Sequence, residues 1–183
     1  MRTPVLLVAV FPLFIGACCS RGAAPATPVA AKSDIAPRPF TADEIRDGMP
    51  VGHELRYRIE EPGKPVAILR MRVVAADAAS VTIASDMLDE QGNVVADQGK
   101  QTSQWTALLA HATWPADKTT RTEATVSTPA GDFPSIDYVV RKDDGSVTTY
   151  RFAKTLPGPP VWMATEKDGT AGQRMVLIGV RKP

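Results

Sequence analysis

The chain has 183 residues, with 21 lysines and arginines against 20 aspartates and glutamates. Such a balanced charge argues against a nucleic-acid or polyanion binder, which presents a basic stripe to its ligand. Both cysteines, Cys18 and Cys19, lie near the N-terminus, so the rest of the chain can form no internal disulfide and no thiolate metal site. The length suits one domain with a hydrophobic core of its own.

The first 17 residues have the composition of a secretory signal peptide. Arg2 supplies a positive charge, an apolar run extends from Val5 to Ile15, and small residues follow. The run has about half of the roughly 20 residues that a membrane-spanning helix needs, and Pro12 would weaken such a helix further. We therefore expect residues 1–17 to be a leader that is removed.

The end of this leader, Ile15-Gly16-Ala17-Cys18, resembles the lipobox of bacterial lipoproteins. The resemblance implies cleavage before Cys18, whose sulfur then carries a diacylglycerol and whose amine is acylated. Cys19 is a competing acceptor, but it would put Cys18 before the cut, where a small residue is usual. The alternative is an ordinary cleavable signal with two incidental cysteines.

The residue after the lipidated cysteine sorts lipoproteins between membranes, and an aspartate there retains them at the inner membrane. Cys19 occupies that place, so the resemblance implies an outer-membrane lipoprotein that faces the periplasm. Residues 19–39 contain six alanines and four prolines without apolar periodicity, a composition that cannot bury enough surface to fold. We expect residues 18–39 to be a lipid anchor followed by an extended tether.

The β-rich periplasmic domain is expected over residues 40–183. It begins with a short helix, because Thr41 and Glu44 form a capping-box pattern and Gly48 and Pro50 stop the helix early. Alternation of apolar and polar residues and the turns between them then predict eight or nine strands, at 54–60, 66–76, 80–88, 94–98, 121–128, 133–142, 146–154, 161–167 and 173–181.

One amphipathic helix interrupts the strands. Trp105, Leu108, Leu109 and Ala112 form an apolar stripe on a helix that starts near Thr102 or Ser103 and stops before Pro115. The expected fold is mainly β: a curved antiparallel sheet or open β-barrel with this helix against it. A two-sheet β-sandwich is the alternative.

The C-terminal half carries a second resemblance. Its segments at 129–133, 150–153 and 156–158, which read PAGDF, YRFA and LPG, resemble those of uncharacterised periplasmic β proteins. The shape of those proteins is similar to the open barrel of the lipoprotein carriers and docking proteins of the cell envelope. Such carriers hold acyl chains in a cavity, so the resemblance implies an apolar ligand.

Catalytic and metal-binding patterns are sparse. The domain has two histidines, His53 and His111, which are far apart in sequence and most simply interpreted as partly exposed structural residues. No Gly-x-Ser-x-Gly motif and no glycine-rich phosphate loop occur. The acidic pairs Asp89-Glu90 and Asp143-Asp144 adjoin turns, which explains them better than glycoside chemistry. We predict no catalytic residues, no metal and no cofactor.

Two groups of side chains have both a structural and a functional interpretation. Aromatic residues, among them Trp105, Trp114 and Trp162, either fill the core or line an apolar pocket. A stripe of arginines either pairs with nearby acids such as Glu54 and Glu60 or faces lipid phosphates or an acidic partner. The members of that stripe are Arg56, Arg58, Arg70 and Arg72.

Three functions follow in order of preference. The first is a non-enzymatic lipoprotein, anchored through Cys18, whose β domain binds an envelope protein partner. The second is a carrier or docking protein for an acyl chain or other apolar ligand, which a cavity lined by Trp105, Val140 and Phe152 would favour. The third is a hydrolase, which requires His53 or His111 beside a serine and a carboxylate.

Overall fold

A single antiparallel sheet dominates the computed structural model, which describes residues 33–183. The predicted signal peptide, Cys18 and residues 18–32 of the predicted tether lie outside the described residues. Within residues 33–183 the sheet has nine strands in the order β4-β3-β2-β1-β9-β8-β7-β6-β5. The strands are β1 (Glu54–Glu60), β2 (Ala67–Ala76), β3 (Ser80–Leu88), β4 (Val94–Gln104), β5 (Thr119–Thr128), β6 (Gly131–Arg141), β7 (Val147–Ala153), β8 (Trp162–Lys167) and β9 (Thr170–Arg181).

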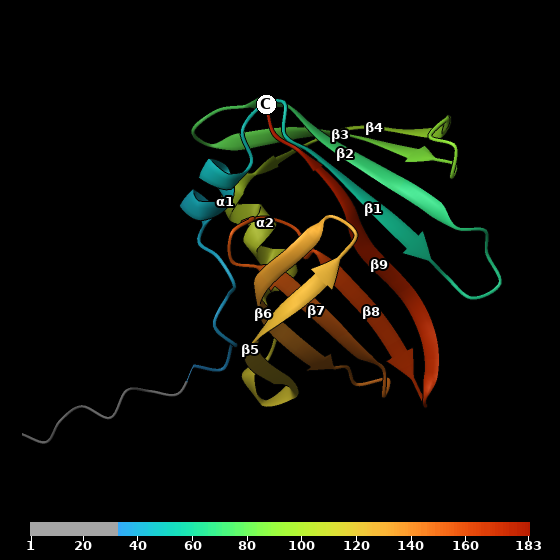
Figure 1. Ribbon diagram of the computed structural model, residues 1–183. Coiled ribbons are helices and arrows are strands. Elements are labelled where there is room, and N and C mark those ends of the chain that lie inside the picture. The colour runs from blue at the N-terminus through green and yellow to red at the C-terminus, as the bar shows by residue number, and fades with distance from the viewer. Residues whose placement is uncertain (1–32) are drawn as a thin grey trace, which may run out of the picture. The chain divides into compact units, whose positions relative to one another are not determined.

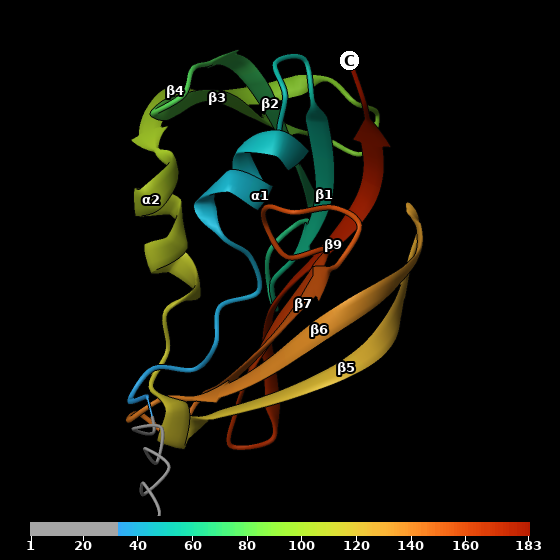
Figure 2. The same cartoon turned by 90° about the vertical axis from the view of Figure 1, so that its left-hand side faces the viewer.

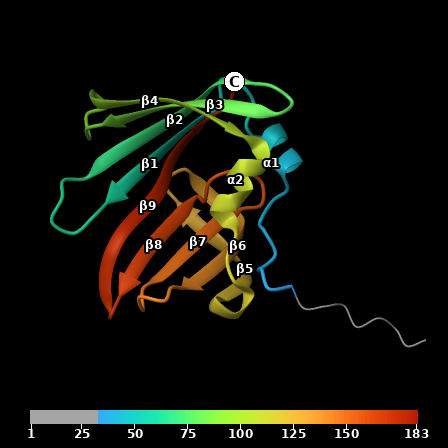
Figure 3. The ribbon, with the colours of Figure 1, turned by 180° about the vertical axis from the view of Figure 1, so that it is seen from behind.

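The sheet is strongly curved but does not close on itself (Figure 1). β4 and β5 lie at its two ends, and they are separate when the sheet is seen from behind (Figure 3). The expected curved antiparallel sheet is therefore confirmed. Neither a closed barrel nor the alternative sandwich forms, because all nine strands belong to one open ladder.

The residue alternation that predicted the strands also sets their two faces. On β1, Leu55 and Tyr57 are buried, whereas Arg56 and Arg58, which alternate with them, are exposed. Successive residues of a strand point to opposite faces, so the apolar set turns inward and the arginines outward.

The helices lie on one side of the sheet, inside its curve (Figure 2). α1 (Ala42–Gly48) has the predicted capping box, in which the Thr41 hydroxyl accepts from the Glu44 N–H at 3.2 Å. Glu44 Oε2 accepts from the Thr41 N–H in return, at 2.7 Å, which lowers the pKa of that carboxyl. No helix within residues 33–183 is long and apolar enough to cross a membrane.

The second helical segment is shorter than predicted. β4 continues to Gln104, because Thr102 and Ser103 pair with Thr82 and Val81 of β3 instead of starting a helix. α2 (Trp105–Leu108) follows, and it passes directly into the 3-10 turn η1 (Leu109–Ala112). A further 3-10 turn, η2 (Ala116–Lys118), leads into β5.

Trp105 anchors α2 to the sheet. Its side chain is only 3% exposed, and its indole N–H donates to the Asp77 carbonyl oxygen at 2.9 Å. The indole thereby satisfies its one polar group within the core. A buried cluster joins the helices to both arms of the sheet; its members are Phe40, Ile45, Met49, Val73, Val81, Trp105, Ile136, Tyr138, Val140 and Phe152.

The segment before α1 belongs to the domain. Ile35 forms a β-bridge with Pro115, and the Ala36 N–H donates to the Trp114 carbonyl at 2.9 Å. The Tyr138 hydroxyl donates to the Pro37 carbonyl at 2.7 Å. These contacts hold residues 35–37, which precede the predicted boundary at residue 40, against the fold.

Candidate ligand cavity

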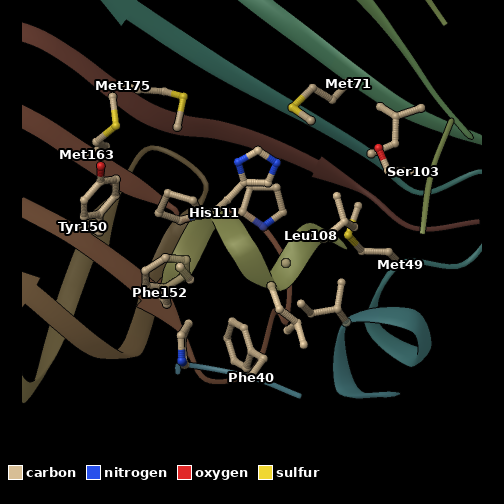
Figure 4. Close-up of a pocket in the computed structure, with 18 of the residues that line it drawn as sticks. Phe40, Met49, Met71, Ser103, Leu108, His111, Tyr150, Phe152, Met163 and Met175 are labelled. Carbon is tan, nitrogen blue, oxygen red and sulfur yellow. The ribbon is translucent and has the colours of Figure 1, made fainter. Parts of the chain in front are cut away.

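A cavity of about 460 Å³ lies between the sheet and the helices (Figure 4). One wall is formed by side chains of β2, β3, β4, β7, β8 and β9. The other is formed by residues 39–40, α1, the α2–η1 segment and the loop at 158–160. The lining side chains are mostly apolar, and none of them is a lysine, arginine, aspartate or glutamate.

The strand wall follows directly from the register of β7, β8 and β9. Tyr150 pairs with Met163, and Met163 pairs with Met175, so the three side chains are cross-strand neighbours on one face. Phe152, two residues beyond Tyr150 on β7, shares that face and contributes a buried ring. Met71 of β2 lines the cavity from the other arm of the sheet.

The opposite wall depends on the loop between β7 and β8. Gly158 has a φ of +143°, a backbone conformation that side-chain-bearing residues rarely adopt. A Cβ there would lie 3.0 Å from the Met49 sulfur, so glycine lets the loop approach α1 closely. A Cβ at Gly48 of α1 would likewise lie 3.0 Å from Pro157 of this loop. The next residues of this loop, Pro159 and Pro160, line the cavity together with Gly158.

Methionine is concentrated around this cavity. Four of the six methionines of the chain line it: Met49, Met71, Met163 and Met175. Met71, Met163 and Met175 lie on β2, β8 and β9, and Met49 directly follows α1. Methionine is unbranched and polarisable, so such a wall adapts to ligands of different shape.

The aromatic residues divide between the cavity and the core. Trp114 stacks on Tyr150 with 4.9 Å between ring centroids, which supports one side of the cavity from outside. Of the three residues named as a cavity signal, only Phe152 lines the cavity. Trp105 and Val140 are 3% and 5% exposed and fill the core instead.

The two histidines occupy different environments. His53 is only 3% exposed, so its predicted partial exposure is wrong, and its Nε2 has no hydrogen-bond partner. Burial and the charge of Lys182 lower the pKa of His53. His111 is exposed and lines the cavity. The hydrolase hypothesis requires an imidazole that hydrogen-bonds a serine or a carboxylate, and within residues 33–183 neither histidine makes such a contact. In the same residues, no three His, Cys, Asp or Glu side chains form a metal-binding group.

The arginine stripe is largely paired with acids. Arg56 lies 2.8 Å from Glu54, Arg58 lies 2.9 Å from Glu60, and Arg70 lies 2.6 Å from Asp86. This confirms the pairing interpretation for these three arginines. Such partly exposed pairs contribute about 0–1 kcal/mol each.

The acidic pairs serve turns. The Asn93 N–H donates to Asp89 at 2.8 Å, and the Ser146 N–H donates to Asp144 at 3.0 Å. Side-chain hydrogen bonds from Asn93 and Ser146 lower the pKa of Asp89 and Asp144, respectively, and the backbone N–H groups of the same two residues lower it further. The turn interpretation of both pairs is confirmed.

Comparisons with known proteins add one structural likeness. Searches of family models and of curated proteins found no match. The solved structure of MucB in complex with MucA(peri) is similar to this chain with a TM-score of 0.49 and 11% sequence identity. The alignment covers 76% of this chain and 55% of that one, so the match spans about half of the neighbour's length.

Proposed function

We propose that the domain is a non-enzymatic binding protein whose cavity holds an acyl chain or another apolar ligand. The observation that carries this proposal is the cavity itself, whose volume of about 460 Å³ is within the range of small-molecule sites. Transfer of each methylene group from water into such an environment contributes about 0.8 kcal/mol. The carrier hypothesis, which was second in order of preference from the sequence, thereby becomes the preferred one.

The shape of the fold supports the same proposal. A sheet that curves without closing exposes an apolar inner face, and the helices cover only part of it. The side chains that remain uncovered are those of Met71, Tyr150, Met163 and Met175, which are all partly exposed. An apolar surface of this kind, rimmed by polar residues, is typical of a ligand site.

A substitution that fills the cavity tests the proposal. Ala112 lines the cavity from η1, whereas Ala110 on the same turn is exposed and does not line it. We expect Ala112→Trp to weaken binding of a fluorescent acyl probe at least tenfold and Ala110→Trp to leave it unchanged. Melting temperatures of both variants control for folding. Equal binding by the two variants, or no binding by the parent protein, would contradict the proposal.

We further propose that the chain is a lipoprotein anchored through Cys18 at the outer membrane and facing the periplasm. The support is the lipobox-like sequence that ends at Cys18, together with the apolar run before it. Acyl chains on the N-terminal residue would hold the domain at a membrane surface. Cys18→Ser should leave the leader uncut and the protein without lipid, as mass spectrometry of the membrane fraction would measure. A normally processed, membrane-bound variant would argue against this anchor.

A second candidate function is binding of an envelope protein at the edge strand β4. Val94 and Val95 are 52% and 63% exposed there, and the outer side of β4 pairs with no other described strand. An exposed edge with apolar side chains accepts an added strand. A photo-crosslinking residue at 95 should then give one discrete adduct in cells, and the substitution Val94→Lys should abolish it. A matched probe at Lys142, in an exposed turn, should give none.

A further inference from the structure

Hydrogen-bonding side chains gather at one part of the cavity lining. They are Ser85 of β3, Gln101 and Ser103 of β4, and His111 of η1. The register explains the placement of the strand residues, because Ser85 pairs with Met71 and Gln101 pairs with Ile83, and all of these line the cavity. Ser103 lies on the same face of β4 as Gln101, two residues farther along.

These four polar groups make no side-chain hydrogen bond to another residue between 33 and 183. By contrast, the hydroxyl of Thr102, which points to the opposite face of β4, contacts the Thr82 hydroxyl at 2.8 Å. The polar atoms on the cavity side are therefore free to bind a ligand.

The lining consequently has a polar part and an apolar part. In the polar part, Gln101 and His111 are exposed, whereas Ser85 and Ser103 are half-buried. Phe40, Met49 and Phe152 are 7%, 4% and 4% exposed and belong to the apolar part. Figure 4 shows Ser103 beside Met71 on one side of the view, with Tyr150 and Phe152 on the other.

We propose that the ligand is a neutral amphiphile of the acylglycerol type, with its chain at the apolar part and its ester and hydroxyl groups at the four polar side chains. This proposal rests on the proposed function of the cavity. The lining contains no lysine, arginine or carboxylate, so a charged head group would gain no ion pair from these residues. Ester and hydroxyl oxygens, in contrast, match serine, amide and imidazole groups.

The test compares three ligands with the same chain: 1-oleoylglycerol, oleate and an octadecene that lacks a polar group. We expect the purified full-length protein to bind 1-oleoylglycerol at least tenfold more tightly than either of the others. Gln101→Leu and Ser103→Ala should each weaken acylglycerol binding about threefold to tenfold, the effect of one lost hydrogen bond, and leave octadecene binding unchanged. Thr102→Val is the matched control and should change neither.

The outcomes separate this inference from the proposed function. Equal affinity for the three ligands, with no effect of the polar substitutions, would overturn the neutral-amphiphile inference while the apolar cavity function stands. Tighter binding of oleate than of 1-oleoylglycerol would overturn it as well, because a charged head group would then be preferred. Absence of binding by all three ligands would overturn the proposed function together with the inference.

Discussion

Individual side chains around the cavity explain how an apolar site can remain adaptable. The cross-strand pair Met163–Met175, together with Met71 on β2 and Met49 just after α1, surrounds the cavity with thioethers. Sequence alternation placed Met71, Met163 and Met175 within predicted strands, but it could not bring them together. Their grouping depends on the curvature of the sheet, which pattern alone does not determine.

Oxidation of these methionines is expected to reduce ligand binding. Hydrogen peroxide transfers an oxygen atom to the thioether, which gives a sulfoxide and water and turns an apolar wall polar. Mild treatment should therefore weaken binding of the acyl probe at least fivefold, in proportion to sulfoxide content measured by mass spectrometry. A variant with leucine at positions 49, 71, 163 and 175 should bind the probe and resist the treatment. Met87 lies outside the cavity lining, so Met87→Leu is the control and should remain as sensitive to the treatment as the parent protein. Equal sensitivity of the fourfold leucine variant and the Met87→Leu control would contradict the methionine assignment.

The buried imidazole of His53 makes stability depend on pH. Burial, and to a smaller extent the charge of Lys182, lower the pKa of His53 below its ordinary value of 6.5. The unfolded chain therefore takes up a proton near pH 6.5 that the folded protein resists, so the free energy of unfolding falls as the pH drops below about 6.5. Urea denaturation between pH 7.5 and 5.5 should show this loss, and His53→Gln should flatten it. An unchanged slope in the variant would show that His53 is not responsible.

At the scale of elements, the sequence predicted eight or nine strands, and the structure has nine between residues 33 and 183, each overlapping a predicted range. The prediction of β1 and β7 was close because their apolar and polar residues alternate cleanly. β4 was predicted too short, since Asp97, Gly99 and Lys100 carry no apolar alternation; that strand is held by its backbone pairing with β3. The apolar stripe beginning at Trp105 correctly predicted a helical segment. That segment starts later than predicted, because Thr102 and Ser103 pair with β3.

The stripe on α2 and η1 is expected to contribute unevenly to stability. Trp105 is buried and hydrogen-bonded, so Trp105→Ala should destabilise the domain by about 3–5 kcal/mol. Leu108 is half-buried and lines the cavity, so Leu108→Ala should cost less, about 1–2 kcal/mol, and should mainly change the affinity for the ligand. Urea midpoints of both variants check the order. A larger loss for Leu108→Ala than for Trp105→Ala would contradict it.

At the scale of the whole domain, the open sheet and its helices leave a cavity that sequence could suggest only by resemblance. Phe152 was correctly connected with such a cavity, whereas Trp105 and Val140 belong to the filled core. The difference arises from their elements: Trp105 is the first residue of α2 and packs into the core, and Val140 lies on β6, which contributes no side chain to the cavity lining. Gln101 and Ser103 gave no signal, because isolated polar residues on an edge strand such as β4 are usually solvated.

The central claim, that this cavity holds an acyl or other apolar ligand, is tested most directly by native mass spectrometry of the protein purified from a bacterial host without denaturant. We predict a co-purifying adduct that dissociates on activation, has the mass of an acyl lipid, and is lost from Ala112→Trp but retained by Ala110→Trp. A bare polypeptide mass for the parent protein, with no uptake of added acyl lipid, would contradict the claim and favour the edge strand β4 as the binding surface.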